Sequence, residues 1–146
     1  MTPPTLHVSP CAWYCFEIGG AWRVDEGGER TLLTAPDGAC SIEIVAARRV
    51  NGTQATDEDA VAAIHEGYLR DEGIQAVKTA LAENPHGISA YVTRGVGTDE
   101  REHVVCHAWW GRYCAFVRYR GRRERSEPER IRAFYDLVDS LQALVD

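Results

Sequence analysis

Apolar and polar residues alternate along several short stretches of the chain, the pattern of half-buried β-strands. The first clear stretch is residues 13–18, which ends at Gly19-Gly20. Residues 30–34 and 40–46 alternate in the same way and flank Ala35-Pro36-Asp37-Gly38, a sequence typical of a tight turn, so they predict a hairpin. Residues 88–93 predict a further strand, and residues 74–81 mix strand and helix signals.

The strongest pattern lies between residues 102 and 120, where two runs rich in valine and aromatic residues are joined by Gly111-Arg112. A Gly-X pair suits a two-residue hairpin turn, and such a turn fixes which residues face one another. One face of the predicted hairpin is almost entirely apolar and is expected to face the core. Its pairs are Trp110 with Tyr113, Ala108 with Ala115, Cys106 with Val117, and Val104 with Tyr119.

The opposite face of the same hairpin is half aromatic and half polar. It pairs Trp109 with Cys114, His107 with Phe116, Val105 with Arg118, and His103 with Arg120. Either a helix covers the apolar end of this face or the face binds a partner. We expect the partner-binding residues of the domain to be His107, Trp109, Phe116, Arg118 and Arg120, since aromatic residues and arginine are typical anchors at interfaces.

Two helices are predicted, one near residues 57–72 and one near residues 127–145. The first has Thr56 as its expected N-cap, Gly73 as its end, and an apolar stripe of Val61, Ile64, His65 and Tyr68. The second begins with a capping box at residues 126–129 and carries Ile131, Phe134, Tyr135, Val138, Leu141 and Val145 at helical spacing. With no internal repeat or linker, the chain is expected to be a single α+β domain over residues 1–146, an antiparallel sheet flanked by helices.

Composition narrows the class of protein. The chain is 45% hydrophobic and 26% charged, as in ordinary globular proteins, and no apolar run approaches the roughly 20 residues that span a bilayer. The first ten residues lack the basic start and apolar stretch of a signal peptide, so a cytoplasmic location and no membrane partner are expected. The five cysteines are odd in number and form no CxxC pair, which favours reduced thiols without a bound metal or cofactor.

Charge is unevenly distributed along the chain. The formal net charge is −6, but residues 103–146 carry eight basic and six acidic side chains. Arginine is interleaved with an aromatic residue in the run 118–125, as on some surfaces that bind single-stranded nucleic acid. Nucleic-acid binding through Arg118–Arg125 is therefore one alternative, although the acidic remainder of the domain would oppose it.

A small cysteine-dependent enzyme is a second alternative, with Cys114 as nucleophile and His107 as base. The hairpin register places these two residues diagonally on one face, roughly 7 Å apart between Cα atoms. No carboxylate or amide on that face is an obvious group to orient the histidine, so no catalytic residue is assigned. His103 and His107 would lie about 13 Å apart on one strand, with Cys106 on the other face, so these residues cannot together bind a metal.

Particular motifs resemble a known family. Residues 9–17, Ser-Pro-Cys-Ala-Trp-Tyr-Cys-Phe-Glu, followed by Trp22, resemble the opening of a small bacterial family of uncharacterised domains with the Mog1/PsbP-like fold. His107-Ala108-Trp109 and residues 138–141 fall where that family has a central hairpin and a C-terminal helix. Relatives of this fold include a small-GTPase-binding factor, photosystem accessory subunits and chaperones for secretion effectors. The resemblance implies binding to another macromolecule and carries over no catalytic residue.

The function expected from the sequence is therefore non-catalytic protein binding of bacterial type, as an adaptor, effector-associated chaperone or immunity-like protein. The sequence leaves the identity of the partner and the oligomeric state open.

Overall fold

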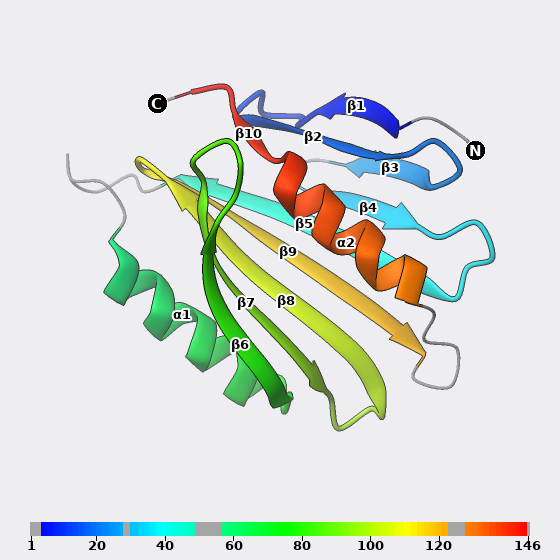
Figure 1. The fold of residues 1–146 in the computed structure, drawn as a ribbon, viewed down its shortest axis with the longest axis vertical. Helices are drawn as coiled ribbons and strands as arrows, with labels where there is room; N and C mark the ends of the chain where they lie inside the picture. The colour runs from blue at the N-terminus through cyan, green and yellow to red at the C-terminus, as the bar shows by residue number, and fades with distance from the viewer. Residues whose placement is uncertain (1–3, 28–29, 49–56, 123–127, 146) are drawn as a thin grey trace.

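Seven strands form one antiparallel sheet (Figure 1). The structure is a computed structural model, which describes residues 4–27, 30–48, 57–122 and 128–145 of the chain. The strand order is β3-β4-β5-β9-β8-β7-β6. The bounds are β3 Arg23–Gly27, β4 Arg30–Thr34, β5 Cys40–Arg48, β6 Gln75–Glu83, β7 Ser89–Val96, β8 Arg101–Trp110 and β9 Tyr113–Arg122.

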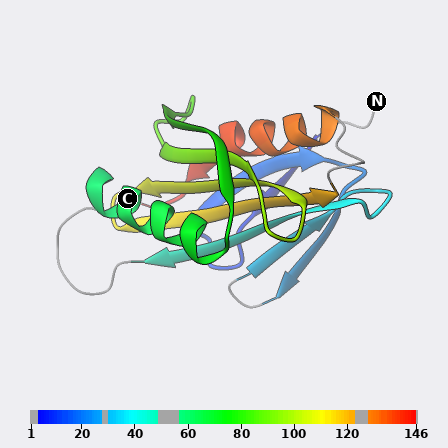
Figure 2. The same cartoon turned by 90° about the horizontal axis from the view of Figure 1, so that it is seen from below.

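A second, three-stranded sheet has the order β1-β2-β10, with bounds Pro4–Val8, Tyr14–Gly19 and Gln142–Ala143. It shares one side of the large sheet with helix α2, Pro128–Ser140, which packs along β2 (Figure 1). Helix α1, Glu58–Asp71, lies on the other side, over the β6, β7 and β8 half of the sheet (Figure 2). The architecture is therefore α+β, with antiparallel sheets flanked by two helices, as the sequence predicts.

The core lies between the large sheet and the layer formed by α2 and the small sheet. Strand β2 contributes Tyr14, Phe16 and Ile18, and α2 contributes Phe134 and Leu137, all of them buried. Because β2 alternates inward apolar residues with the exposed Glu17, its sequence pattern matches its position.

The central hairpin has the predicted register. Strands β8 and β9 turn at Gly111-Arg112, and Ala108 pairs with Ala115 while His107 pairs with Phe116. Ala108 is completely buried on the core face, and Gly111 has the positive φ of 52° that the turn requires. The hairpin at residues 35–38 is confirmed as well, because β4 and β5 pair on either side of it.

Three details of the helices differ from the prediction. The predicted cap Thr56 lies outside the described residues, and the N-cap is Asp57, whose side chain accepts a hydrogen bond from the Ala60 backbone N–H at 2.7 Å. Ile64 points to solvent, because only Val61 and His65 of α1 are buried. Helix α2 ends at Ser140 rather than near residue 145, and the chain continues as strand β10 beside β2.

The end of α2 is fixed by contacts from distant parts of the chain. The Asn84 side-chain amide donates to the backbone carbonyls of Val138 and Leu141, at 3.0 and 2.9 Å. The Ser140 hydroxyl accepts a hydrogen bond from the Glu17 backbone N–H at 2.8 Å. Asn84 thus binds carbonyls that a longer helix would use, and Ser140 ties the helix end to β2, with which the tail then pairs. Residues 126 and 127 of the predicted capping box lie outside the described residues.

Candidate interaction surface

Helix α1 covers part of the face that the sequence predicts as a binding surface. His107 is only 8% exposed and lies under α1, with its ring 5.0 Å from that of His65. Phe116 contacts the ring of Tyr68, also from α1, at a centroid distance of 4.7 Å. The structure therefore divides the predicted surface into a part that packs against a helix and a part that remains accessible.

His107 belongs to a buried chain of hydrogen bonds between α1 and the sheet. Its Nδ1 lies 2.8 Å from Nδ1 of His65, whose Nε2 lies 2.6 Å from the Thr93 hydroxyl. Thr93 in turn bonds the Thr79 hydroxyl of β6 at 2.8 Å. Burial lowers the pKa of both histidines, and the neighbouring His65 contributes to the lowering of the pKa of His107 to about 4. Both rings are therefore neutral near pH 7, and their role is to attach α1 to the sheet.

The two arginines of the predicted surface are held by other side chains. Arg118 donates to the Tyr68 hydroxyl and lies 3.8 Å from the Glu43 carboxylate. Arg120 donates to the Asp99 carboxylate at 3.0 Å. Because both guanidinium groups already have anionic neighbours, they offer less positive charge than the arginine run alone indicates. Arg123 and Arg125 of that run lie outside the described residues.

The environment of Cys114 is opposite to that of an activated nucleophile. Burial raises the pKa of its thiol, whereas a nucleophilic cysteine needs a thiolate near neutral pH. His107, the histidine that would act as its base, has its Nδ1 engaged by His65. In the described part of the chain, no three His, Cys, Asp or Glu side chains are grouped closely enough to hold a metal ion.

Trp109 is the second aromatic residue of the predicted surface, and its stacking partner belongs to the sheet and not to α1. It lies beyond the histidine pair, half-buried, and stacks on Tyr91 of β7 at 5.7 Å and 22°. Tyr91 pairs with Leu81 of β6, and Leu81 is 50% exposed. Trp109 and Leu81 line one shallow groove together with Glu58, Ala82, Glu83 and Ser89. The accessible part of the predicted surface therefore continues onto β6, where the sequence did not place a binding residue.

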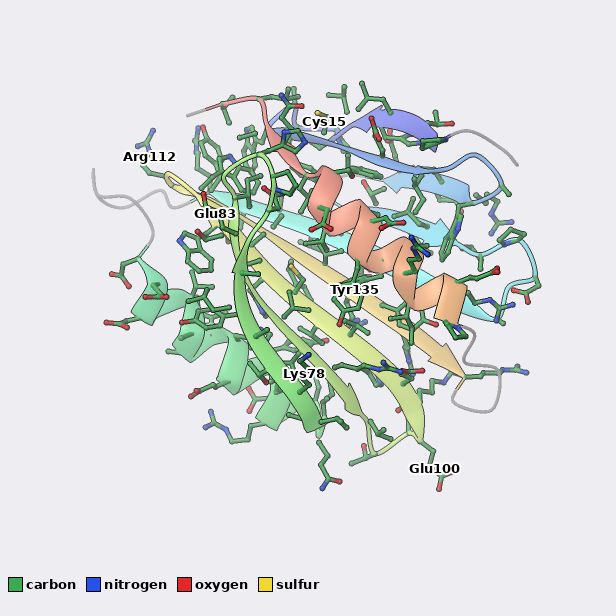
Figure 3. All side chains as sticks on the ribbon, viewed as in Figure 1. Cys15, Lys78, Glu83, Glu100, Arg112 and Tyr135 are labelled. Atoms are coloured by element: carbon green, nitrogen blue, oxygen red, sulfur yellow. The ribbon has the colours of Figure 1, made fainter. Side chains whose placement is uncertain are left out.

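Strand β6 is the edge of the large sheet, and among the described residues no strand pairs with its outer side. All nine of its residues are exposed, including Val77 at 74%. Figure 3 labels Glu83, the last residue of β6, and Lys78 in its first half. Strand β3 at the opposite edge has only five residues, three of them charged, which is how natural proteins protect an edge. Strand β6 is longer and has charges only at Lys78 and Glu83, although a bulge interrupts it between Ala76 and Lys78.

The hydrogen-bond pattern shows which backbone groups of β6 are directed outward. Asn84 N donates to Ile88 O at 2.8 Å, so this pair bonds across β6 and β7. Because bonded and non-bonded pairs alternate in an antiparallel ladder, Ala82 and Ala80 also bond to β7. The N–H and C=O groups of Thr79, Leu81 and Glu83 are therefore directed away from β7. Their side chains share the face of Thr93, which is the α1 face.

The motif at residues 9–17 has a structural role. Ser9 is buried, and its hydroxyl accepts hydrogen bonds from the backbone N–H groups of Trp13 and Tyr14, at 3.1 and 3.3 Å. It thus sets the turn from which β2 enters the core. Cys11 lies in this turn and is not part of β2.

Comparison with known proteins shows the fold and nothing finer. No protein-family model matches the chain, and no curated protein matches it. The cyanobacterial PsbP of Synechocystis sp. PCC 6803 superimposes with a TM-score of 0.66 at 7% identity, over 98% of this chain and 94% of that one. A crystal structure from Bacteroides thetaiotaomicron superimposes with a TM-score of 0.58 at 15% identity, over 98% of this chain. This chain spans about half of the Bacteroides protein, 49%.

These likenesses are compatible with a non-catalytic module. No helix among the described residues has the length and apolarity needed to cross a bilayer.

The superposition on PsbP shows that the chain has the Mog1/PsbP-like fold that the motifs at residues 9–22 and 107–109 predict.

Proposed function

We propose that this domain is a non-catalytic protein-binding module that takes up an extended segment of another protein along strand β6. The observation that carries the proposal is the outer side of β6, with which no strand of the described ranges pairs and toward which the backbone groups of Thr79, Leu81 and Glu83 are directed. An edge of this kind accepts an added strand through main-chain hydrogen bonds, while neighbouring pockets select side chains. The exposed Leu81 and the Trp109–Tyr91 stack supply such a pocket beside the edge.

The role of adaptor, effector-associated chaperone or immunity-like protein fits this mode of binding, because each acts by holding another chain. Nucleic-acid binding is a weaker candidate than protein binding, because Arg118 and Arg120 form ion pairs with Glu43 and Asp99. A cysteine enzyme is also a weaker candidate, because the pKa of the Cys114 thiol is raised.

Two substitutions at one position test the edge directly. Leu81→Pro and Leu81→Ala both remove the leucine side chain, but only proline also removes the outward backbone N–H. Proline is tolerated on an edge strand where its missing N–H would face solvent, so both variants are expected to fold. Partners captured from a lysate of the native host by the unmodified chain should be retained at least in part by Leu81→Ala and lost by Leu81→Pro.

Circular dichroism of both variants provides the control for folding. A partner that binds Leu81→Pro and the unmodified chain equally would contradict binding along β6.

A further inference from the structure

The groove beside β6 is acidic. Its lining residues include Glu58, at the start of α1, and Glu83, at the end of β6, and none of them is basic. Both carboxylates belong to exposed residues. A segment that enters this groove therefore meets negative charge on two sides of the apolar surface formed by Leu81 and Trp109.

Two further carboxylates of α1, those of Asp59 and Glu66, act on Tyr91, which lies beside the groove. The pKa of Tyr91 is raised, first by desolvation and then by the negative charges of Glu58, Asp59 and Glu66. These side chains are therefore close enough to Tyr91, the partner of Trp109 in the aromatic stack, for their charges to act on it.

Among the residues that the structure describes, no basic side chain lines the groove to balance this charge. Lys78 lies one register position from Thr79 and so points to the opposite face of β6, on the same side as its pair Arg94. Arg112 is at the hairpin turn and is not part of the groove lining.

The helix dipole accounts for only half of the carboxylates. Glu58 and Asp59 lie in the first turn of α1, where negative charge is favourable without any ligand. Glu66 is in the middle of α1 and Glu83 is on a strand, so neither compensates for a helix end. Glu83 lines the groove and lies on the edge strand itself, where the helix dipole gives no reason for its negative charge.

We propose that the β6 groove receives a positively charged extended segment of another protein. This inference rests on the proposed function and names the chemistry of the partner. Alternate side chains of an added strand face the same side, so the segment has a basic residue two positions from an aliphatic or aromatic residue. The apolar side chain lies against Leu81, and the basic side chain lies beside Glu83 or Glu58, within reach of the exposed face of Trp109.

A library of phage-displayed random nonapeptides, selected on the unmodified chain, tests the inference even while the natural partner is unidentified. Selected peptides should be enriched in lysine or arginine two positions from an apolar residue. A synthetic peptide from the selection should bind at least ten-fold more weakly to Glu83→Lys and to Glu58→Lys. Glu26→Lys makes the same change of charge on β3, at the opposite edge, and should leave the affinity within two-fold.

Ionic strength gives a second readout. Raising the salt concentration from 50 mM to 500 mM should weaken binding of the basic peptide several-fold, because exposed charge pairs are screened. The difference between Leu81→Pro and Leu81→Ala should persist at both salt concentrations, because it depends on a backbone hydrogen bond.

The outcomes separate the two proposals. Selected peptides that are neutral or acidic, yet fail to bind Leu81→Pro, would overturn the charge of the segment and leave binding along β6 standing. Selected peptides that bind Leu81→Pro as well as Leu81→Ala would overturn both, as would a selection that enriches nothing. A dimer of the chain alone that Leu81→Pro dissociates would identify a second copy as the occupant and overturn the basic partner.

Discussion

Trp109 and Trp110 are adjacent in sequence but lie on opposite faces of β8, so they allow a comparison of two roles for one residue type. Trp110 is 9% exposed and packs in the core against Tyr14 and Tyr113. Trp109 is half-buried and has Tyr91 as its stacking partner. We expect Trp110→Ala to lower the free energy of unfolding by about 3–5 kcal/mol, the cost of a large cavity in a core.

Trp109→Ala should cost less, about 2 kcal/mol, from the loss of one aromatic pair and of the part of its ring area that is buried. Urea unfolding of both variants, followed by circular dichroism, measures the two values. A cost for Trp109→Ala as large as that for Trp110→Ala would remove Trp109 from the interaction surface and make it part of the core.

At the scale of elements, α1 is attached to the sheet through a pair of histidines that must remain neutral. One Nδ1 of the His65–His107 pair donates and the other accepts, and protonating both rings would bring two N–H groups together at this contact. The Thr93 hydroxyl, Tyr68 and Phe116 surround the pair. The negative charge of Glu66 acts to raise the pKa of His65, but burial outweighs it and the pKa is lowered.

This arrangement predicts a loss of stability in mild acid. The pKa of His107 is about 4 in the folded chain and about 6.5 when unfolded, so the unfolded chain binds more protons between these values. The contribution is fully present above pH 6.5 and is lost as the pH falls towards 4, at up to about 1.4 kcal/mol per pH unit for one proton. Urea unfolding at a series of pH values should show this slope.

His107→Phe removes the titrating ring at similar size, so its slope between pH 6.5 and 4 should be shallower. His86→Phe, which changes an exposed histidine in the loop after β6, is the control and should leave the slope unchanged. An unaltered slope in His107→Phe would show that other groups cause the acid sensitivity.

The elements that could be predicted from sequence are those whose pattern and turn agree. Strands β8 and β9 were predicted with the correct register because Gly111-Arg112 leaves only two residues for the turn. Strand β6 gave mixed signals because both of its faces are exposed, so burial imposes no alternation on its residues. The edge that carries the proposed site is thus the element that a search for core patterns detects least well.

The remaining errors have a common physical cause. Strands β1 and β10 exist because they pair with β2, and such long-range partners leave little trace in the local sequence. The end of α2 depends in the same way on Asn84, more than fifty residues earlier. Likewise, the hairpin pattern indicated an amphipathic face with Trp109 on it. It could not indicate that α1 covers His107 at one end of that face and leaves Trp109 accessible at the other.

At the scale of the whole molecule, one core joins the two sheets. Side chains of β2 in the small sheet pack with those of β5, β8 and α2. Such a core should unfold as one cooperative unit. Three buried cysteines can show whether the two sheets unfold together, because Cys15 lies in β2 of the small sheet, while Cys40 in β5 and Cys106 in β8 belong to the large sheet.

We expect the three thiols to react with a small disulfide reagent at the same opening free energy, equal to that of global unfolding. Cys11 is exposed and should react at once, and all five thiols should be recovered in denaturant. Mass spectrometry of peptides after timed labelling distinguishes the positions. If Cys15 became accessible far more readily than Cys106, the small sheet would open by itself, and the molecule would consist of two cooperative units that share an interface.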